Sequence, residues 1–239
     1  MQATLDVRRA SDRATTSIDW LESHHSFNFG PHHQVNNDGH GLLLVSNDDI
    51  VVGGGGFGMH GHRDMEIVTW VLDGELEHRD STGTHGVIYP GLAQRMSAGS
   101  GIRHSEHNAS ATEPVRFVQM WVVPDEVGLE PSYEQRDMNA ALDAGGLVPV
   151  ASGKGHPNAI SLNQRGAAFW VGRFDEGDTF ELPDARFVHL YVARGHLGFD
   201  ATCLTQGDAT RFTNAGSVTM QVRAASEVLV WESDDEVQR

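Results

Sequence analysis

The sequence predicts an all-β protein, and three features of its 239 residues support this. Runs rich in β-branched and aromatic residues are short, as expected for strands. Turn signals separate them, drawn from 27 glycines and 8 prolines. Long amphipathic helical stretches are scarce. Short strands at this spacing indicate a sandwich or barrel rather than a parallel sheet.

Strand and turn signals alternate along the first half from Glu66 onward. Asp73-Gly74 predicts a hairpin turn, and Pro90-Gly91 is typical of a type II turn. The stretch before His60 is predicted to form polar loops, and one of its five histidines is a candidate for a cavity mouth. These histidines are His24, His25, His32, His33 and His40. The strands predicted after it cover residues 66–72, 76–79, 86–89, 93–97, 102–106 and 114–123.

A second set of strands follows a charged, proline-containing stretch over residues 124–135. A short helix is predicted over 137–143, ended by Gly145-Gly146. The later strands are predicted over 167–174, 186–192, 197–199, 217–222 and 228–231. We therefore expect two β domains of similar design, over residues 1–132 and 133–239.

Charge and cysteine content restrict the function classes. With 33 acidic and 17 basic residues the formal net charge is −16, which argues against direct nucleic-acid binding. Cys203 is the single cysteine, so an intrachain disulfide or a multi-thiolate metal site is excluded. The N-terminus lacks the apolar core of a signal peptide, and no apolar run is long enough to span a bilayer. We expect a cytoplasmic protein with no membrane partner.

Two pairs of metal-ligand residues stand at strand spacing in the first half. His60 and His62 would project from one face of a strand, and His104 and Glu106 repeat the same spacing later. A lone pair of this kind is common on solvated strands. Two such pairs, each beside glycine-rich turns, favour one ion bound by three imidazoles and a carboxylate.

Other residues near these pairs have competing interpretations. Glu66 shares strand parity with His60 and His62, so residue spacing alone leaves open which carboxylate completes the site. His78 and His85 flank turns and are expected to be exposed. His107 is expected to point away from Glu106.

The segments around the two pairs resemble a known family. Residues 58–70 (GMHGHRDMEIVTW) and 96–106 (MSAGSGIRHSE) are similar to the two signatures of the pirin family of bicupins. Residues 77–81 and 131–135 also resemble bacterial members with quercetinase activity. The resemblance implies two cupin barrels, with iron or a similar ion only in the N-terminal one, and it favours Glu106 over Glu66 as the ligand. Gly61 departs from the family pattern, which often has proline there.

The activity implied by this resemblance is that of a quercetin 2,3-dioxygenase acting on a flavonol. Glu106 would be both a metal ligand and the catalytic base, on one divalent transition metal ion, with Fe first and Mn, Co, Ni, Cu or Zn as alternatives. Apolar pocket candidates, each with core packing as its alternative role, are Phe27, Phe29, Phe57, Met59 and Met96. Two other functions stay open: a metal-binding regulator acting through protein partners, and a Zn or Mn isomerase or hydrolase.

Overall fold

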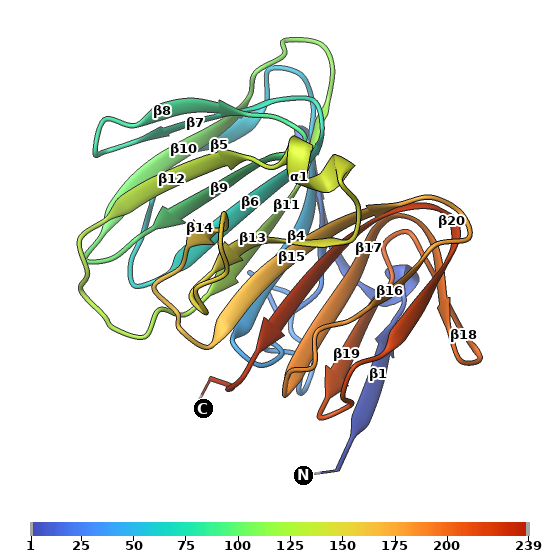
Figure 1. Ribbon diagram of the computed structural model, residues 1–239. Coiled ribbons are helices and arrows are strands. Elements are labelled where there is room, and N and C mark those ends of the chain that lie inside the picture. Colours follow the sequence, from blue (N-terminus) through green and yellow to red (C-terminus); the bar gives the residue numbers. More distant parts are fainter. Residues whose placement is uncertain (1, 238–239) are drawn as a thin grey trace.

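The computed structural model of the protein describes residues 2–237 and confirms the all-β class (Figure 1). Within that range the strands form three sheets, and the helical elements are a 3-10 turn (Ala10–Asp12) and α1 (Asn139–Asp143). The helix predicted over 137–143 is thus present but starts two residues later, because Asp137 still pairs with Leu92 in a sheet.

The first cupin barrel is built from two facing sheets. A seven-stranded sheet has the order β12-β9-β6-β11-β4-β3-β2, and a four-stranded sheet has the order β5-β10-β7-β8. The strands of the larger sheet are β2 (Ala14–Ile18), β3 (Leu21–His25), β4 (Leu43–Val51), β6 (Glu66–Asp73), β9 (Leu92–Ser97), β11 (Val115–Val122) and β12 (Ser132–Asp137). Those of the smaller sheet are β5 (Gly56–His62), β7 (Leu76–Asp80), β8 (His85–Ile88) and β10 (Ile102–Asn108).

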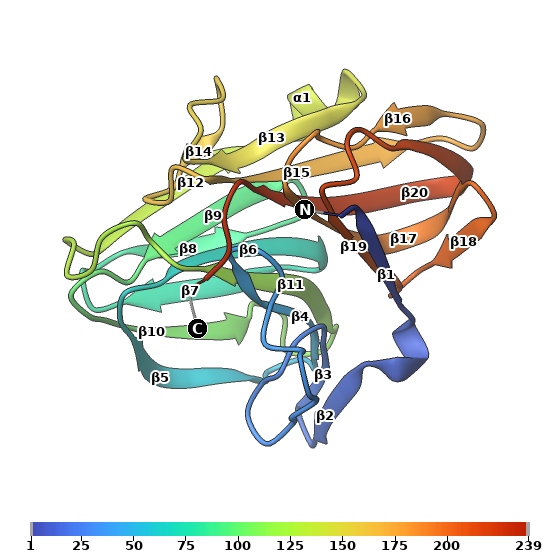
Figure 2. The same ribbon diagram turned by 90° about the horizontal axis from the view of Figure 1, so that it is seen from below.

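The second cupin is formed by a nine-stranded sheet. Its strands are β1 (Thr4–Arg8), β13 (Leu147–Ser152), β14 (Ile160–Ser161), β15 (Ala167–Phe174), β16 (Thr179–Glu181), β17 (Phe187–Phe199), β18 (Thr202–Thr205), β19 (Ala209–Thr213) and β20 (Thr219–Ser233). Figures 1 and 2 show the N-terminal strand β1 beside β19. The division at residue 132 stays a prediction; strand pairing crosses it twice, since β1 pairs with β19 and β12 with β9.

Both faces of the seven-stranded sheet are buried, and the side chains of β6 alternate between two different cores. Val68 and Trp70 belong to a core cluster shared with the second cupin, including Phe169 and Trp231. Val71, on the other face, packs inside the first barrel. Successive side chains of a strand point to opposite faces, so even-numbered positions of β6 face the second cupin and odd-numbered ones face the barrel interior.

Several strand predictions need correction. The region predicted to form polar loops before His60 contains β2, β3 and all of β4. The charged stretch over residues 124–135, predicted to leave the first domain, runs into β12, which is an edge strand, where one face and one edge can stay solvated. The two predicted strands within β17 are one strand, bent where its register with β20 shifts, and Gly195 at φ 87° supplies a conformation that other residues rarely adopt. The two predicted strands within β20 are likewise continuous.

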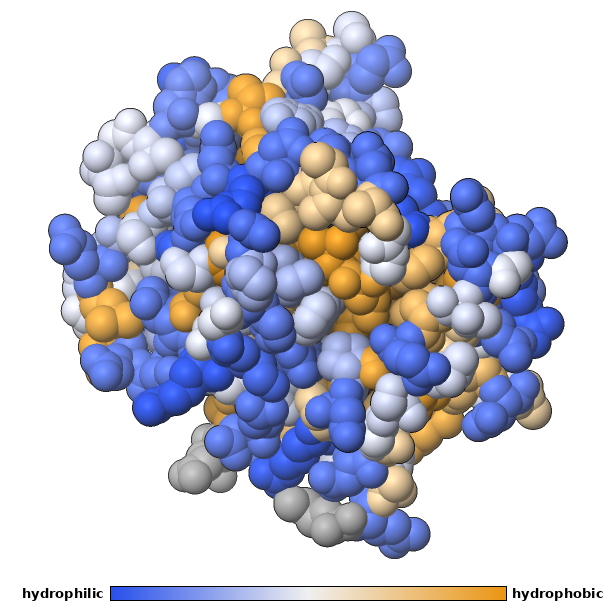
Figure 3. Space-filling view, in the orientation of Figure 1, coloured by the Kyte–Doolittle hydropathy of each residue, from blue (hydrophilic) through white to orange (hydrophobic). Residues whose placement is uncertain are grey.

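The molecular surface is mainly hydrophilic on the face shown in Figure 3, with hydrophobic side chains gathered near its centre beside α1. This agrees with the formal charge of −16. Among residues 2–237, no helix has the length and apolar character needed to cross a membrane.

Candidate metal centre

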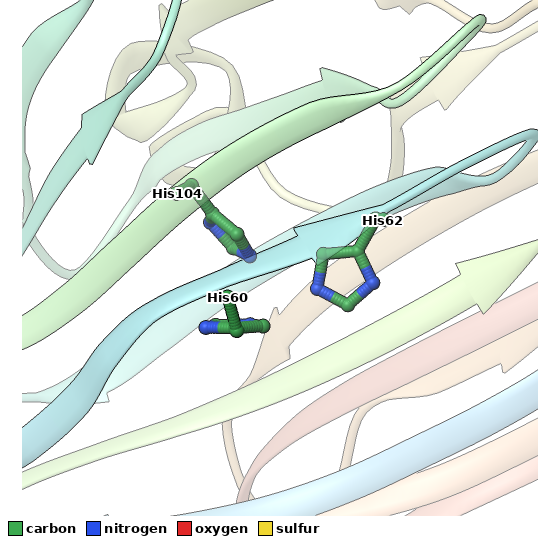
Figure 4. A group of neighbouring side chains, drawn as sticks. All are labelled: His60, His62 and His104. Carbon is green, nitrogen blue, oxygen red and sulfur yellow. The ribbon is translucent and has the colours of Figure 1, made fainter.

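Three histidines from two neighbouring strands converge inside the first barrel. β5 and β10 are antiparallel, with His60 opposite His104 and His62 opposite Ile102. One ring nitrogen from each of the three histidines lies within 4.8 Å of the others. Their ring centroids are 4.4 to 4.9 Å apart. Figure 4 shows the three rings gathered beside the two strands.

A register shift between β5 and β10 orients this group. His104 is opposite His60, but Glu106 is opposite Phe57, so two residues of β5 face the single Ser105. Such a bulge changes the alternation of side chains along the strand that carries the extra residue. It therefore accounts for Phe57 contacting His60, at 6.5 Å between ring centroids, despite their odd spacing.

The ring nitrogens of the histidines are chemically suited to a cation. Nε2 of His62 and Nε2 of His104 are buried and have no hydrogen-bond partner among the described residues. Nδ1 of His60 donates to the carbonyl of Gly58 at 2.8 Å, which leaves its Nε2 bare in the neutral ring. Burial lowers the pKa of His62 to about 4 and that of His104 to about 2. Neutral imidazoles with free lone pairs are the form that binds a transition metal.

Glu106 lies beside this group and is held by one amide. Both of its carboxylate oxygens accept from Nε2 of Gln119, at 3.0 and 2.8 Å. Burial raises the pKa of Glu106 to about 7, against the opposing effect of the Gln119 hydrogen bond. Glu106 forms a second group of ligand atoms within 4.8 Å with His104 and His78. His104 is thus shared between the group of three histidines and the group that contains Glu106.

Sequence reasoning missed two residues of β11 that support the site. Nε1 of Trp121 donates to Oε1 of Gln119 at 3.1 Å, so the amide presents its NH₂ group to Glu106. The Trp121 ring meets His62 edge-on at 4.9 Å and Phe29 at 5.7 Å. Alternation along β11 could have indicated both, because Phe117, a barrel core residue, shares their parity.

The prediction that His78 is exposed is wrong. Its side chain is fully buried and donates to Asp80 at 3.1 Å. His78 lies in β7 between Leu76, which is also buried, and Asp80, so strand parity directs all three inward. His85 is exposed, as predicted, and His107, predicted to point away from Glu106, is exposed while Glu106 is buried.

The alternative ligand Glu66 faces the second cupin. Its carboxylate accepts from the backbone and side-chain nitrogens of Asn163, at 3.1 and 3.3 Å. The parity shared with His60 and His62 is interrupted because β5 ends at His62 and a turn with Asp64 at φ 49° precedes β6. Glu66 therefore neither joins the histidines nor lines their pocket.

The remaining candidates divide between the site and the core. Phe29 and Phe57 contact rings of the site, and Met59 is half exposed on β5. Phe27 belongs to the core shared with the second cupin, and Met96 packs with Ile67 inside the first barrel, so for these two core packing is the observed role. His25, assigned to a loop, is buried at the end of β3 and stacks on Phe29.

Comparisons with known proteins agree with this architecture. The Pirin family model matches residues 7–122, and the model of the quercetinase C-terminal cupin domain matches residues 149–232. A Mycobacterium bovis protein provisionally named quercetin 2,3-dioxygenase is 53% identical over 234 residues, covering 97% of this chain and 96% of that protein. The quercetin 2,3-dioxygenase of Escherichia coli K12 is 34% identical over 227 residues, covering 95% and 97%.

A solved structure with the same fold also contains a metal. The bacterial pirin YhhW of Escherichia coli in complex with nickel(II) matches with a TM-score of 0.90 and 32% identity, covering 98% of this chain and 100% of that one.

Proposed function

This chain belongs to the pirin family, and from that premise we propose that it is a metal-dependent dioxygenase that opens the heterocyclic ring of flavonols such as quercetin. The observation that carries the proposal is the convergence of three imidazoles, one of which, His104, also lies beside the buried carboxylate of Glu106. The family relatives named for this activity support the choice of substrate class.

His60, His62, His104 and Glu106 are the proposed ligands of one divalent transition metal. The unpartnered Nε2 atoms of His62 and His104 fit such an ion, since a buried acceptor without a donor is costly unless something else occupies it. Iron stays the first expectation, with Mn, Co, Ni, Cu and Zn as alternatives, because nitrogen and oxygen ligands suit all of them. The bound ion would supply Lewis-acid stabilisation of the flavonol anion and a centre for reaction with oxygen.

Glu106 is the proposed base for the flavonol 3-hydroxyl proton. A catalytic base works best with a pKa near the operating pH, and burial raises the pKa of Glu106 to about 7 in the metal-free protein. The amide of Gln119 keeps the carboxylate oriented, and Trp121 in turn fixes that amide. These contacts hold the proton acceptor in one place before substrate arrives.

The aromatic side chains around the histidines suit a flat, mainly apolar substrate. Trp121 and Phe29 are half-buried and meet edge-to-face, and the Trp121 ring also meets His62. Aromatic faces of this kind contribute apolar contact area, and the carboxylate and imidazoles supply the few polar contacts that orient a ligand.

Oxygen consumption tests the proposal directly. Protein loaded separately with Fe, Mn, Co, Ni or Cu should consume oxygen with quercetin as substrate. Glu106→Gln should reduce turnover about 10²- to 10⁴-fold, the usual contribution of a general base. Glu75→Gln, the same change at an exposed position, should leave turnover unchanged. Metal content is measured on every sample, so loss of the ion is distinguished from loss of the base. No uptake with any of the five metals would contradict the dioxygenase proposal.

A further inference from the structure

We propose that Asp80 and His78 are positioning residues that fix the ring tautomer of His104, so that its Nε2 lone pair faces the metal site. The inference rests on the proposed function, because it concerns one of the proposed metal ligands. His78, which the sequence predicts to be exposed, is buried. A chain of hydrogen bonds runs from Asp80 through His78 in β7 to His104 in β10.

The two oxygens of Asp80 have different partners. Oδ1 accepts from the backbone nitrogens of Thr82 and Thr84, at 2.9 and 3.2 Å, and from the Thr82 hydroxyl at 2.6 Å. Oδ2 faces Nε2 of His78 at 3.1 Å. Burial alone would raise the pKa of Asp80, but the hydrogen bonds from Thr82, His78 and Thr84 outweigh it and lower the pKa. An ionised carboxylate can only accept, so Nε2 of His78 carries a hydrogen.

His78 transmits this constraint to His104. With its hydrogen on Nε2, facing Asp80, the neutral His78 ring has a bare Nδ1. That Nδ1 lies 3.5 Å from Nδ1 of His104, at the long end of the hydrogen-bond range. Since Nδ1 of His78 can only accept, Nδ1 of His104 must carry the shared hydrogen. A neutral His104 then has a bare Nε2, which is the buried atom with no partner.

The surrounding strands hold the hydrogen-bonded chain Asp80–His78–His104, here called the relay, in place. β7 and β10 pair so that His104 lies opposite Asp80 and Glu106 opposite His78. The Tyr133 ring, from β12, packs against the His78 ring at 4.9 Å between centroids. Ring rotation of His78 is therefore restricted by Tyr133 and by its hydrogen bonds at both nitrogens. Partners of this kind commonly change metal affinity 10- to 100-fold.

A competing role for His78 is direct ligation. His78, His104 and Glu106 place ligand atoms within 4.8 Å of one another, so an ion could in principle bind there. The geometry favours the positioning role of His78 over direct ligation, because Nδ1 of His78 and Nδ1 of His104 already face each other. The two roles differ in metal stoichiometry and in the tautomer of His104 before metal is added.

Asp80→Asn is the sharpest test because it can reverse the relay with little change in shape. The Asn oxygen can keep the turn hydrogen bonds of Asp80 Oδ1, while its NH₂ group takes the position of Oδ2 and donates to His78. His78 would then carry its hydrogen on Nδ1 and face His104 as a donor, leaving the His104 hydrogen on Nε2. Thr82→Val is the matched control, since it removes a hydrogen bond only from the Oδ1 side.

The first readout is nitrogen-15 NMR of the metal-free protein, which distinguishes the two ring tautomers. We expect His104 to carry its hydrogen on Nδ1 in the unsubstituted protein and in Thr82→Val, and on Nε2 in Asp80→Asn. The second readout is titration with Ni²⁺ by calorimetry. We expect one ion per chain, 10- to 100-fold weaker binding in Asp80→Asn, and binding within twofold of the unsubstituted protein in Thr82→Val.

A second pair of variants covers the case in which Asp80→Asn folds poorly. His78→Asn retains an oxygen that can accept from His104, whereas His78→Leu retains none, so Ni²⁺ affinity should be recovered in the first relative to the second. Equal affinity in both, an Nε2–H tautomer of His104 in the unsubstituted protein, or two ions per chain would overturn the relay. Absence of metal binding by the unsubstituted protein would instead contradict the proposed function, while the tautomer of metal-free His104 would still test the relay.

Discussion

At the scale of single residues, the barrel interior contains two carboxyl groups whose pKa values are raised by burial to near neutral pH. Burial raises the pKa of Glu106 to about 7, and it raises that of Asp49 to about 7 with a further contribution from nearby Asp48 and Glu106. Only Glu106 has an amide donor on both oxygens. Oδ1 of Asp49 is buried without a partner among the described residues. The two acids therefore differ in environment, although both sit inside the same barrel.

The position of Asp49 makes the metal-free protein less stable as pH rises. Its pKa is raised from 3.8 to about 7 on folding, so its stabilising contribution is fully present below pH 3.8 and is lost as pH rises through 7. Asp49→Asn removes this dependence. We compare the free energy of unfolding of the variant with that of the unsubstituted protein. From pH 4 to pH 8 this difference should move in favour of the variant by on the order of 2–4 kcal/mol, at about 1.4 kcal/mol per pKa unit. Urea unfolding of both metal-free proteins at several pH values measures this, and parallel pH profiles would contradict it.

At the scale of elements, strand β5 carries two of the proposed ligands while lying at the edge of its sheet. Gly56 and Gly61 are both in this strand but have different surroundings. A methyl group at Gly56 would meet Nδ1 of His107 at 2.4 Å and the carbonyl oxygen of Glu106 at 2.6 Å. At Gly61 the nearest atom would be the carbonyl oxygen of Ile102 at 3.6 Å, an ordinary contact. Of these two positions, only Gly56 is packed so closely against the neighbouring backbone that it requires glycine.

Alanine substitutions at these two glycines should have opposite effects. Gly61→Ala should raise the free energy of unfolding by about 0.4–1 kcal/mol, because alanine restricts the unfolded chain at a position that it can occupy without strain. Gly56→Ala should lower it by about 1–3 kcal/mol through overpacking against β10. Thermal and urea unfolding of the two variants, side by side, measures the sign. Similar losses in both would show that β5 has no room at Gly61.

At the scale of the whole molecule, the two cupins share one hydrophobic core. Trp70 of the first barrel meets Phe169 of the second at 6.4 Å between ring centroids, and its Nε1 donates to Glu227 at 2.8 Å. Strand β1 adds a covalent connection, since the chain begins in the sheet of the second cupin. A shared core of this kind couples the stability of the two barrels.

Unfolding should accordingly follow a single cooperative transition. Trp70→Ala should lower the free energy of unfolding by about 3–5 kcal/mol, because it leaves a cavity in the shared core and removes the indole hydrogen bond to Glu227. It should also separate the transitions of the two barrels. Trp20→Ala, at a half-buried position beside Phe57, is the control and should cause a smaller loss with one transition. Scanning calorimetry distinguishes the outcomes, and an unchanged single transition in Trp70→Ala would contradict the coupling.

The sequence by itself determined the all-β class, the family and the placement of His60 and His62 on one side of a single strand. Turn signals and short β-branched runs specify local backbone geometry, and these local preferences are properties of neighbouring residues. The i, i+2 spacing likewise places His60 and His62 on one side of β5 without knowledge of other strands. Metal binding by these residues stays a prediction.

Only the tertiary structure decided which polar residues share the barrel interior. Glu66 and His78 each follow strand alternation, but the turn before β6 directs Glu66 to the second cupin, and the pairing of β7 with β10 brings His78 to His104. Gln119 meets Glu106 in the same way, from a strand of the facing sheet. The physical reason is that alternation fixes the face of one strand only, while the register and the facing of sheets depend on pairings between residues far apart in the chain.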